Sequence, residues 1–111
     1  MSVRLARVDL RDIEPAKRPE HCCAVAEAHL DDGRQFSILT ATPSWFAEAL
    51  SNAGMRYYYG SLVLFVRRMD PSLVKKAVAE MVAAGDRCLC LHDTPRTTLP
   101  RVLADFKARH I

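Results

Sequence analysis

Residues 36–43, with the sequence FSILTATP, join an apolar run to a small polar residue and a proline. The run Phe36–Ala41 favours a β-strand, and Thr42-Pro43 opens an amphipathic helix pattern. A capping side chain followed by proline is typical of a helix start, because the N–H that proline lacks would have no intrahelical partner. Residues 36–43 therefore predict a strand that leads directly into a helix.

The same design occurs twice more along the chain. Leu62–Val66 precedes Asp70-Pro71, and Cys88–Leu91 precedes the polar stretch Asp93–Pro100. Three helices are thus predicted, each with apolar residues at helical spacing. Their buried stripes are Trp45, Phe46, Ala49 and Leu50 in the first helix (Pro43 to Ala53), Leu73, Val74, Ala77, Val78, Met81 and Val82 in the second, and Leu99, Val102, Leu103 and Phe106 in the last. Gly54 and Gly85 are the predicted stops of the first two.

The N-terminal part predicts further strands. Polar and apolar residues alternate over Val3–Leu10, which is typical of a half-exposed strand at an edge. Asp12–His21 contains two prolines and mixed charges and is predicted to be a loop. Cys22–Leu30 and Arg34–Ala41 flank Asp31-Asp32-Gly33, which indicates a hairpin. The small residues Ala24, Ala26 and Ala28 share one strand face and would let a helix approach closely.

These elements predict one α+β domain over residues 1–111, with a mixed, mostly antiparallel sheet of about five strands and three helices packed on it. If Met55–Tyr59 is a strand that pairs with Leu62–Val66 through Gly60-Ser61, the order is ferredoxin-like, βαββαβ, after an N-terminal strand and hairpin. If the tyrosine segment is a loop, the order becomes βαβαβα with three parallel strands.

Composition excludes several classes of protein. The formal charge is +3, and the basic residues, 12 of 16 of them arginine, are interleaved with acids, so no nucleic-acid-binding arm is predicted. No apolar run approaches the roughly 18 residues that span a bilayer, so no membrane partner is expected. The N-terminus lacks the continuous apolar core of a signal peptide, and we expect a cytoplasmic protein with four reduced thiols.

Cys88, Cys90 and His92 alternate along one predicted strand and would share a face. Cys88 and His92 would lie roughly 13 Å apart, because a strand rises about 3.3 Å per residue. Other metal ligands would have to come from His21, Cys22 or Cys23, without zinc-site spacing. Cys90 with His92 is also a poor nucleophile–base pair, since neighbours on one strand face seldom meet in that geometry. We predict buried cysteines, with no metal, no cofactor and no catalytic residue.

Polar residues at the predicted strand ends form a candidate ligand site. Carboxyl ends of parallel strands share one sheet edge, and helix N-termini there favour anions. Arginines nearby would add charge-assisted donors, although the threonines could simply cap helices and the arginines pair with aspartates. The candidate anion-binding residues are Thr42, Arg67, Arg68, His92, Asp93, Arg96 and Thr97.

The segment Arg56-Tyr57-Tyr58-Tyr59 is a candidate interface. In a strand, Tyr57 and Tyr59 would face one way and Tyr58 the other, so one side must meet water or a partner. Tyrosine is enriched at interfaces because it combines a large apolar ring with a polar tip. The alternative is a half-buried strand with surface hydroxyls. His21, His29 and His110 are assigned no role.

Two functions follow from these features. The first is a small non-enzymatic interaction module, homodimeric through the tyrosine segment and the Val3–Leu10 edge strand. The second is a small enzyme or sensor for an anionic metabolite, with His92 as acid or base, Asp93 orienting it, and Arg67 or Arg96 holding the anion.

Overall fold

The computed structural model describes residues 3–60, 62–85 and 97–110. These residues form one four-stranded mixed sheet and three helices. The sheet order is β1-β2-β3-β4; β1 with β2 and β2 with β3 are antiparallel, whereas β3 and β4 are parallel. The elements are β1 (Leu5–Glu14), β2 (Cys23–Leu30), β3 (Gln35–Ala41), α1 (Pro43–Asn52), β4 (Val63–Phe65), α2 (Pro71–Ala84) and α4 (Leu99–His110).

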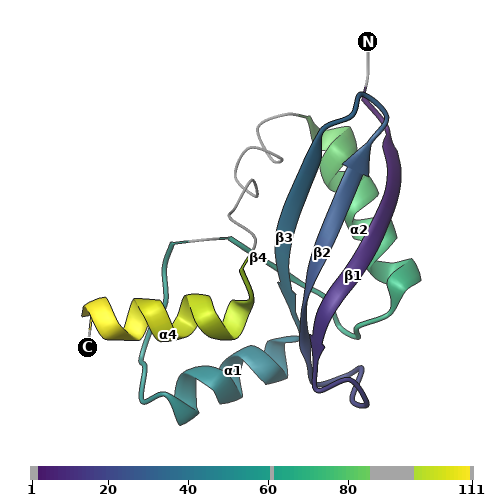
Figure 1. The fold of residues 1–111 in the computed structure, drawn as a ribbon. Helices are drawn as coiled ribbons and strands as arrows, with labels where there is room; N and C mark the ends of the chain where they lie inside the picture. The colour runs from purple at the N-terminus through teal and green to yellow at the C-terminus, as the bar shows by residue number, and fades with distance from the viewer. Residues whose placement is uncertain (1–2, 61, 86–96, 111) are drawn as a thin grey trace.

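Helices cover the sheet on opposite sides, with α2 on one side and α1 and α4 on the other (Figure 1). The side chains of β2 point alternately to the two sides of the sheet, so each side has its own buried cluster. Ala24, Ala26 and Ala28 lie in a buried cluster with Val74 and Val78 of α2. A helix thus covers the alanine face, but the strand that α2 approaches most closely is β1.

The intervening residues of β2 point to the other layer. Cys23 and Val25 are buried with Leu99, Leu103 and Phe106 of α4, against which Trp45 and Phe46 of α1 also pack. Burial on both faces makes β2 the centre of the fold.

The two predicted strand-to-helix junctions that lie wholly within the described residues begin helices as expected, but their caps differ. Asp70 accepts a hydrogen bond from the N–H of Ser72 at 2.9 Å, and Pro71 is the first residue of α2. Thr42 precedes Pro43 in the same way, yet its side chain makes no cap hydrogen bond. The Thr42 hydroxyl instead accepts from the N–H of Cys22 at 3.1 Å and lies 3.3 Å from the Cys22 carbonyl. Thr42 therefore ties the start of α1 to the start of β2.

Of the two alternatives for Met55–Tyr59, the structure has the loop: residues 55–60 are not in a strand. Tyr58 packs instead against Phe46 of α1 and Phe106 of α4. Gly54 and Gly60, at φ 69° and 129°, lie near the two ends of this connection, where the chain adopts bends that side chains disfavour. The ferredoxin-like order and the fifth strand are therefore absent from the described residues, and Cys88–Leu91 lies outside them.

The predicted loop over Asp12–His21 begins too early. β1 continues to Glu14, which pairs with Cys23, through an irregularity in the register after Arg11. Asp12 has φ 54° there, so the strand bends and then resumes its pairing. The predicted hairpin and edge position are confirmed, since β1 contacts only β2 in the described sheet.

We expect Val78→Asp to unfold the protein, because Val78 is fully buried beneath α2 and its aspartate would be an unpaired buried charge. The cost should exceed about 4 kcal/mol, comparable with the stability of a small domain. Leu73→Asp is the matched control, since Leu73 is 37% exposed on the first turn of the same helix. Thermal unfolding followed by circular dichroism checks both variants. Cooperative melting of Val78→Asp near the wild-type temperature would contradict this packing.

Candidate functional site

A histidine, a serine and a glutamate meet beside the first turns of α1. His21, in the loop before β2, places Nε2 2.7 Å from a carboxylate oxygen of Glu48. Its Nδ1 lies 3.0 Å from the hydroxyl oxygen of Ser44. Ser44 and Glu48 are four residues apart, so both lie on one face of the helix. The imidazole therefore bridges two side chains of α1, and we call these three residues the histidine cluster.

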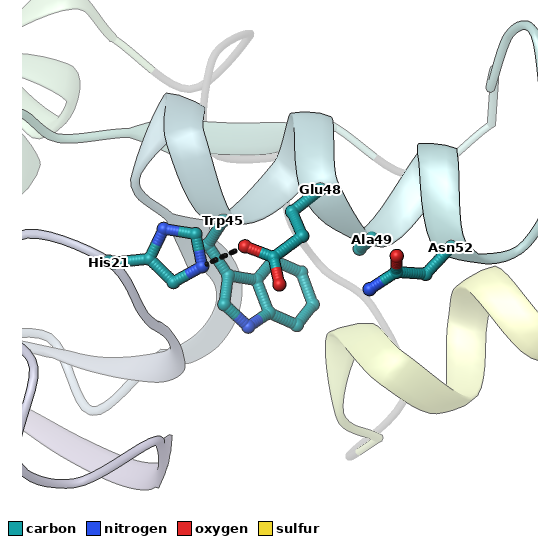
Figure 2. Close-up of a pocket in the computed structure, with 5 residues that line it drawn as sticks. All are labelled: His21, Trp45, Glu48, Ala49 and Asn52. Atoms are coloured by element: carbon teal, nitrogen blue, oxygen red, sulfur yellow. Dashed lines mark ion pairs between the residues drawn. The ribbon is translucent and has the colours of Figure 1, made fainter.

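Figure 2 shows the imidazole of His21 beside the Glu48 carboxylate and the indole of Trp45. These residues, with Ala49 and Asn52, line a cavity of about 160 Å³. The side chain of His21 is 15% exposed, whereas that of Glu48 is 57% exposed. Water and small solutes can thus reach the cluster from the Glu48 side.

Aromatic side chains gather around Phe106 of α4. The rings of Tyr57 and Tyr59 stand edge-on to Phe106, with centroids 6.1 and 5.1 Å away. These two tyrosine rings are nearly parallel to each other, at 6.3 Å and 12°. His110 packs against Phe106 at 4.3 Å, and its Nδ1 lies 3.5 Å from the Tyr59 hydroxyl. The tyrosines are therefore held in place by the helix behind them.

The same region exposes apolar area. Tyr57, Tyr59, Leu62 and Phe65 are 57, 60, 43 and 48% exposed. The described residues contain six exposed large apolar side chains, and these four fall within nine positions of the chain. A groove of about 350 Å³ adjoins them, with Phe46, Tyr58 and Val63 in its wall. We call Tyr57, Tyr59, Leu62 and Phe65 the aromatic surface.

A third hollow, of about 370 Å³, lies between β1 and the start of α4. Its lining residues are Arg11, Asp12, Thr97, Thr98 and Arg101. Arg11 is paired with Asp12 and Glu27, yet its buried Nη2 atom has no partner among the described residues. Arg101 forms no ion pair within the described ranges. The hollow thus combines two guanidinium groups with two threonines.

The predicted anion-binding residues are partly dispersed. Ala41 of β3 pairs with Phe65 of β4, so Thr42, Arg67 and Arg68 follow the two parallel strands at the same end of the sheet. Thr42 is buried, however, whereas Arg67 and Arg68 are exposed. Thr97 lines the hollow beside Arg11. His92, Asp93 and Arg96 lie outside the described residues.

Arg56 is exposed beside the aromatic surface, and Tyr58 is half-buried between α1 and α4. The predicted interface segment therefore has two kinds of tyrosine: Tyr58 belongs to the core between the helices, and Tyr57 and Tyr59 face outward.

Cys22 and Cys23 are buried and free. Burial raises the pKa of Cys22, and burial together with the Glu14 charge raises the pKa of Cys23 to about 12. Both thiols are thus protonated, unreactive members of the core at neutral pH. Cys88 and Cys90 lie outside the described residues. Within the described residues, no group of three or more histidine, cysteine or acidic side chains could hold a metal ion.

Sequence reasoning missed the histidine cluster and the hollow lined by Arg11. His21 lies 23 positions before Ser44, and no local motif links the two. The one available signal was the serine and glutamate four residues apart at a helix start, a common pattern by itself.

No known protein family, curated protein or solved structure matches this chain. In the described part of the chain, none of the helices has the length and apolar character that crossing a membrane requires.

We expect Cys22 and Cys23 to resist an aromatic disulfide reagent in the native protein at neutral pH, because only the thiolate reacts and both thiols are buried. Both should react rapidly after unfolding in guanidinium chloride, which serves as the control. Mass spectrometry of the labelled peptides distinguishes them from Cys88 and Cys90. Rapid modification of Cys23 in the folded protein would be incompatible with its place in the core.

Proposed function

We propose that the protein is an interaction module that associates with a second copy of itself through the aromatic surface. The exposure of Tyr57, Tyr59, Leu62 and Phe65 on one part of the molecule is the observation on which this proposal depends. Contiguous exposed apolar groups are typical of interaction sites, and tyrosine is enriched among the residues that dominate binding energy.

Support for a second copy as the partner comes from the shape of this region. A twofold interface must be complementary to itself, so projections and hollows have to occur on the same surface. Here the projecting rings of Tyr57 and Tyr59 adjoin the groove walled by Phe46 and Tyr58. Each copy can then place its Tyr57 and Tyr59 rings in the groove of the other copy.

Preorganisation also favours the aromatic surface. Phe106 supports both exposed tyrosines from behind, so their rings lose little rotational freedom on binding. The β1 edge is less suitable as a contact surface, because it carries Arg7, Asp9 and Arg11 and its register is irregular near both ends. Charges and bulges on an edge strand discourage pairing with another chain.

We expect Tyr59→Ala to weaken self-association while leaving the fold intact, since the Tyr59 ring is 60% exposed. Loss of one such anchor should raise the dimer dissociation constant at least about tenfold. Light-scattering mass after size exclusion, over a wide range of concentrations, measures the effect.

Two variants serve as controls for that measurement. Leu73→Ala removes an exposed apolar side chain from α2 and should leave the dimer unchanged. Tyr58→Ala should lower thermal stability, because Tyr58 packs between Phe46 and Phe106. A wild-type protein that stays monomeric at the highest concentration would refute the proposal.

A second candidate function is recognition of an anionic small molecule in the hollow beside α4. The specific observation in its favour is that, within the described ranges, the buried Nη2 of Arg11 has no partner and Arg101 forms no ion pair. Guanidinium groups bind carboxylates and phosphates through paired N–H donors. Thr97 and Thr98 would add hydroxyl donors from the residues just before α4.

We expect inorganic phosphate to raise the melting temperature of the wild-type protein and to have a smaller effect on Arg101→Ala. Stabilisation by a ligand follows its concentration relative to its dissociation constant, so a titration separates binding from a general salt effect. Sodium chloride at equal ionic strength is the control. Equal stabilisation of both proteins by phosphate would exclude this site.

A further inference from the structure

We propose that the histidine cluster is a nucleophilic site that hydrolyses small esters, with Ser44 as the nucleophile, His21 as the general base and Glu48 as the positioning residue. A serine in hydrogen-bond reach of an imidazole whose other nitrogen meets a carboxylate is the arrangement that activates a serine hydroxyl. The two distances here, 3.0 Å and 2.7 Å, fall within that reach.

The carboxylate determines where the imidazole holds its proton. Glu48 accepts a hydrogen bond from Nε2–H of His21, so the neutral ring leaves Nδ1 without a proton. That nitrogen lies 3.0 Å from the hydroxyl oxygen of Ser44 and can accept its proton. The neutral form of the cluster is therefore prepared to take the serine proton.

A second acceptor makes this arrangement sensitive to protonation. The hydroxyl of Ser44 also lies 3.2 Å from the main-chain carbonyl of Glu20. When the imidazole carries both protons, Nδ1–H donates to Ser44 and the hydroxyl turns to Glu20. Among the described residues, Glu48 supplies the one charged side chain within hydrogen-bond distance of the His21 ring. The doubly protonated imidazole therefore cannot take the Ser44 proton.

The cavities next to the histidine cluster suit an acyl group, although Ser44 itself lines neither of them. Ser44 and Trp45 are in the first turn of α1, where N–H groups have no intrahelical partner and can donate to a developing oxyanion. Trp45 and Ala49 line the cavity of Figure 2 and also a second cavity of about 330 Å³ between α1 and α4. Pro100 and Leu103 contribute to the walls of the second cavity, so an apolar acyl chain is the substrate class that fits.

The chemistry balances with water as the only co-reactant. The Ser44 oxygen forms a bond to the acyl carbon while its proton passes to Nδ1 of His21, and the tetrahedral intermediate expels the alcohol, which takes that proton. Water then attacks the acyl-serine, giving one proton to Nδ1. The carboxylic acid leaves, and the proton returns to Ser44. Glu48 stays ionised and stabilises the imidazolium that forms in each half.

This activity does not depend on self-association, because none of the three residues belongs to the aromatic surface. Failure of the dimer and failure of the hydrolytic site are separately measurable.

The test is hydrolysis of p-nitrophenyl acetate and p-nitrophenyl butyrate by the full chain and its variants. Ser44→Ala should lower kcat/KM at least about 100-fold, the usual contribution of a base-activated nucleophile. Ser51→Ala, an exposed serine near the end of α1, is the matched control and should leave kcat/KM unchanged. The apolar cavity predicts a higher kcat/KM for the butyrate than for the acetate.

Covalent trapping keeps the test decisive if Ser44→Ala does not fold. A fluorophosphonate probe should modify Ser44 of the wild-type protein, as located by peptide mass spectrometry, and should not modify Ser51. His21→Ala should abolish this labelling. Absence of a Ser44 adduct, or equal hydrolysis by wild-type and folded Ser44→Ala protein, would overturn the proposal.

Glu48→Gln distinguishes a positioning role from a structural one. The amide cannot stabilise the imidazolium by charge, so kcat should fall while KM stays close to the wild-type value. Because Glu48 is largely exposed, thermal stability should change little. An unchanged kcat in Glu48→Gln would remove Glu48 from the mechanism and contradict the proposed cluster.

Discussion

The contact between the alanine face of β2 and helix α2 is the constraint on which the rest of the structure depends. Ala24, Ala26 and Ala28 lie in one buried cluster with Val74 and Val78 of α2, which also packs against β1. A larger residue at one of these alanines would displace α2, because closely packed interiors absorb added volume poorly. In the sheet, β2 lies between β1 and β3, and β1 is an edge strand.

The opposite face of the sheet is covered differently, by two helices and an aromatic connection. α1 and α4 share it, and the chain between α1 and β4 packs its tyrosines on Phe106 instead of extending the sheet. Tyr58 completes the core between the two helices, whereas Tyr57 and Tyr59 remain outside it. The exposed aromatic surface is thus a direct consequence of how this layer is filled, and a partner that covers it would complete the burial.

Local signals made much of this fold predictable. Apolar stripes, proline at the first helical position and the Asp-Asp-Gly turn all act within a few residues, and they correctly located α1, α2, α4 and the hairpin.

Features that depend on contacts between distant residues could not be predicted from the sequence. Three adjacent tyrosines suit a strand, but Phe106, almost fifty residues later, gives them a different support. Thr42 and Asp70 precede proline identically, yet only Asp70 caps its helix, because Cys22 engages the Thr42 hydroxyl. The histidine cluster could not be predicted either, because His21 comes close to Ser44 and Glu48 only in the folded chain.

Amide hydrogen exchange at low and at high protein concentration tests most directly whether the aromatic surface is an interface. If the protein self-associates through the aromatic surface, protection should depend on concentration only in peptides that cover residues 56–65 and the part of α4 around Phe106 and His110. The exposed outer side of α2 and the β1 edge should exchange equally at both concentrations. Protection at the β1 edge in place of residues 56–65, or identical exchange everywhere, would contradict this account.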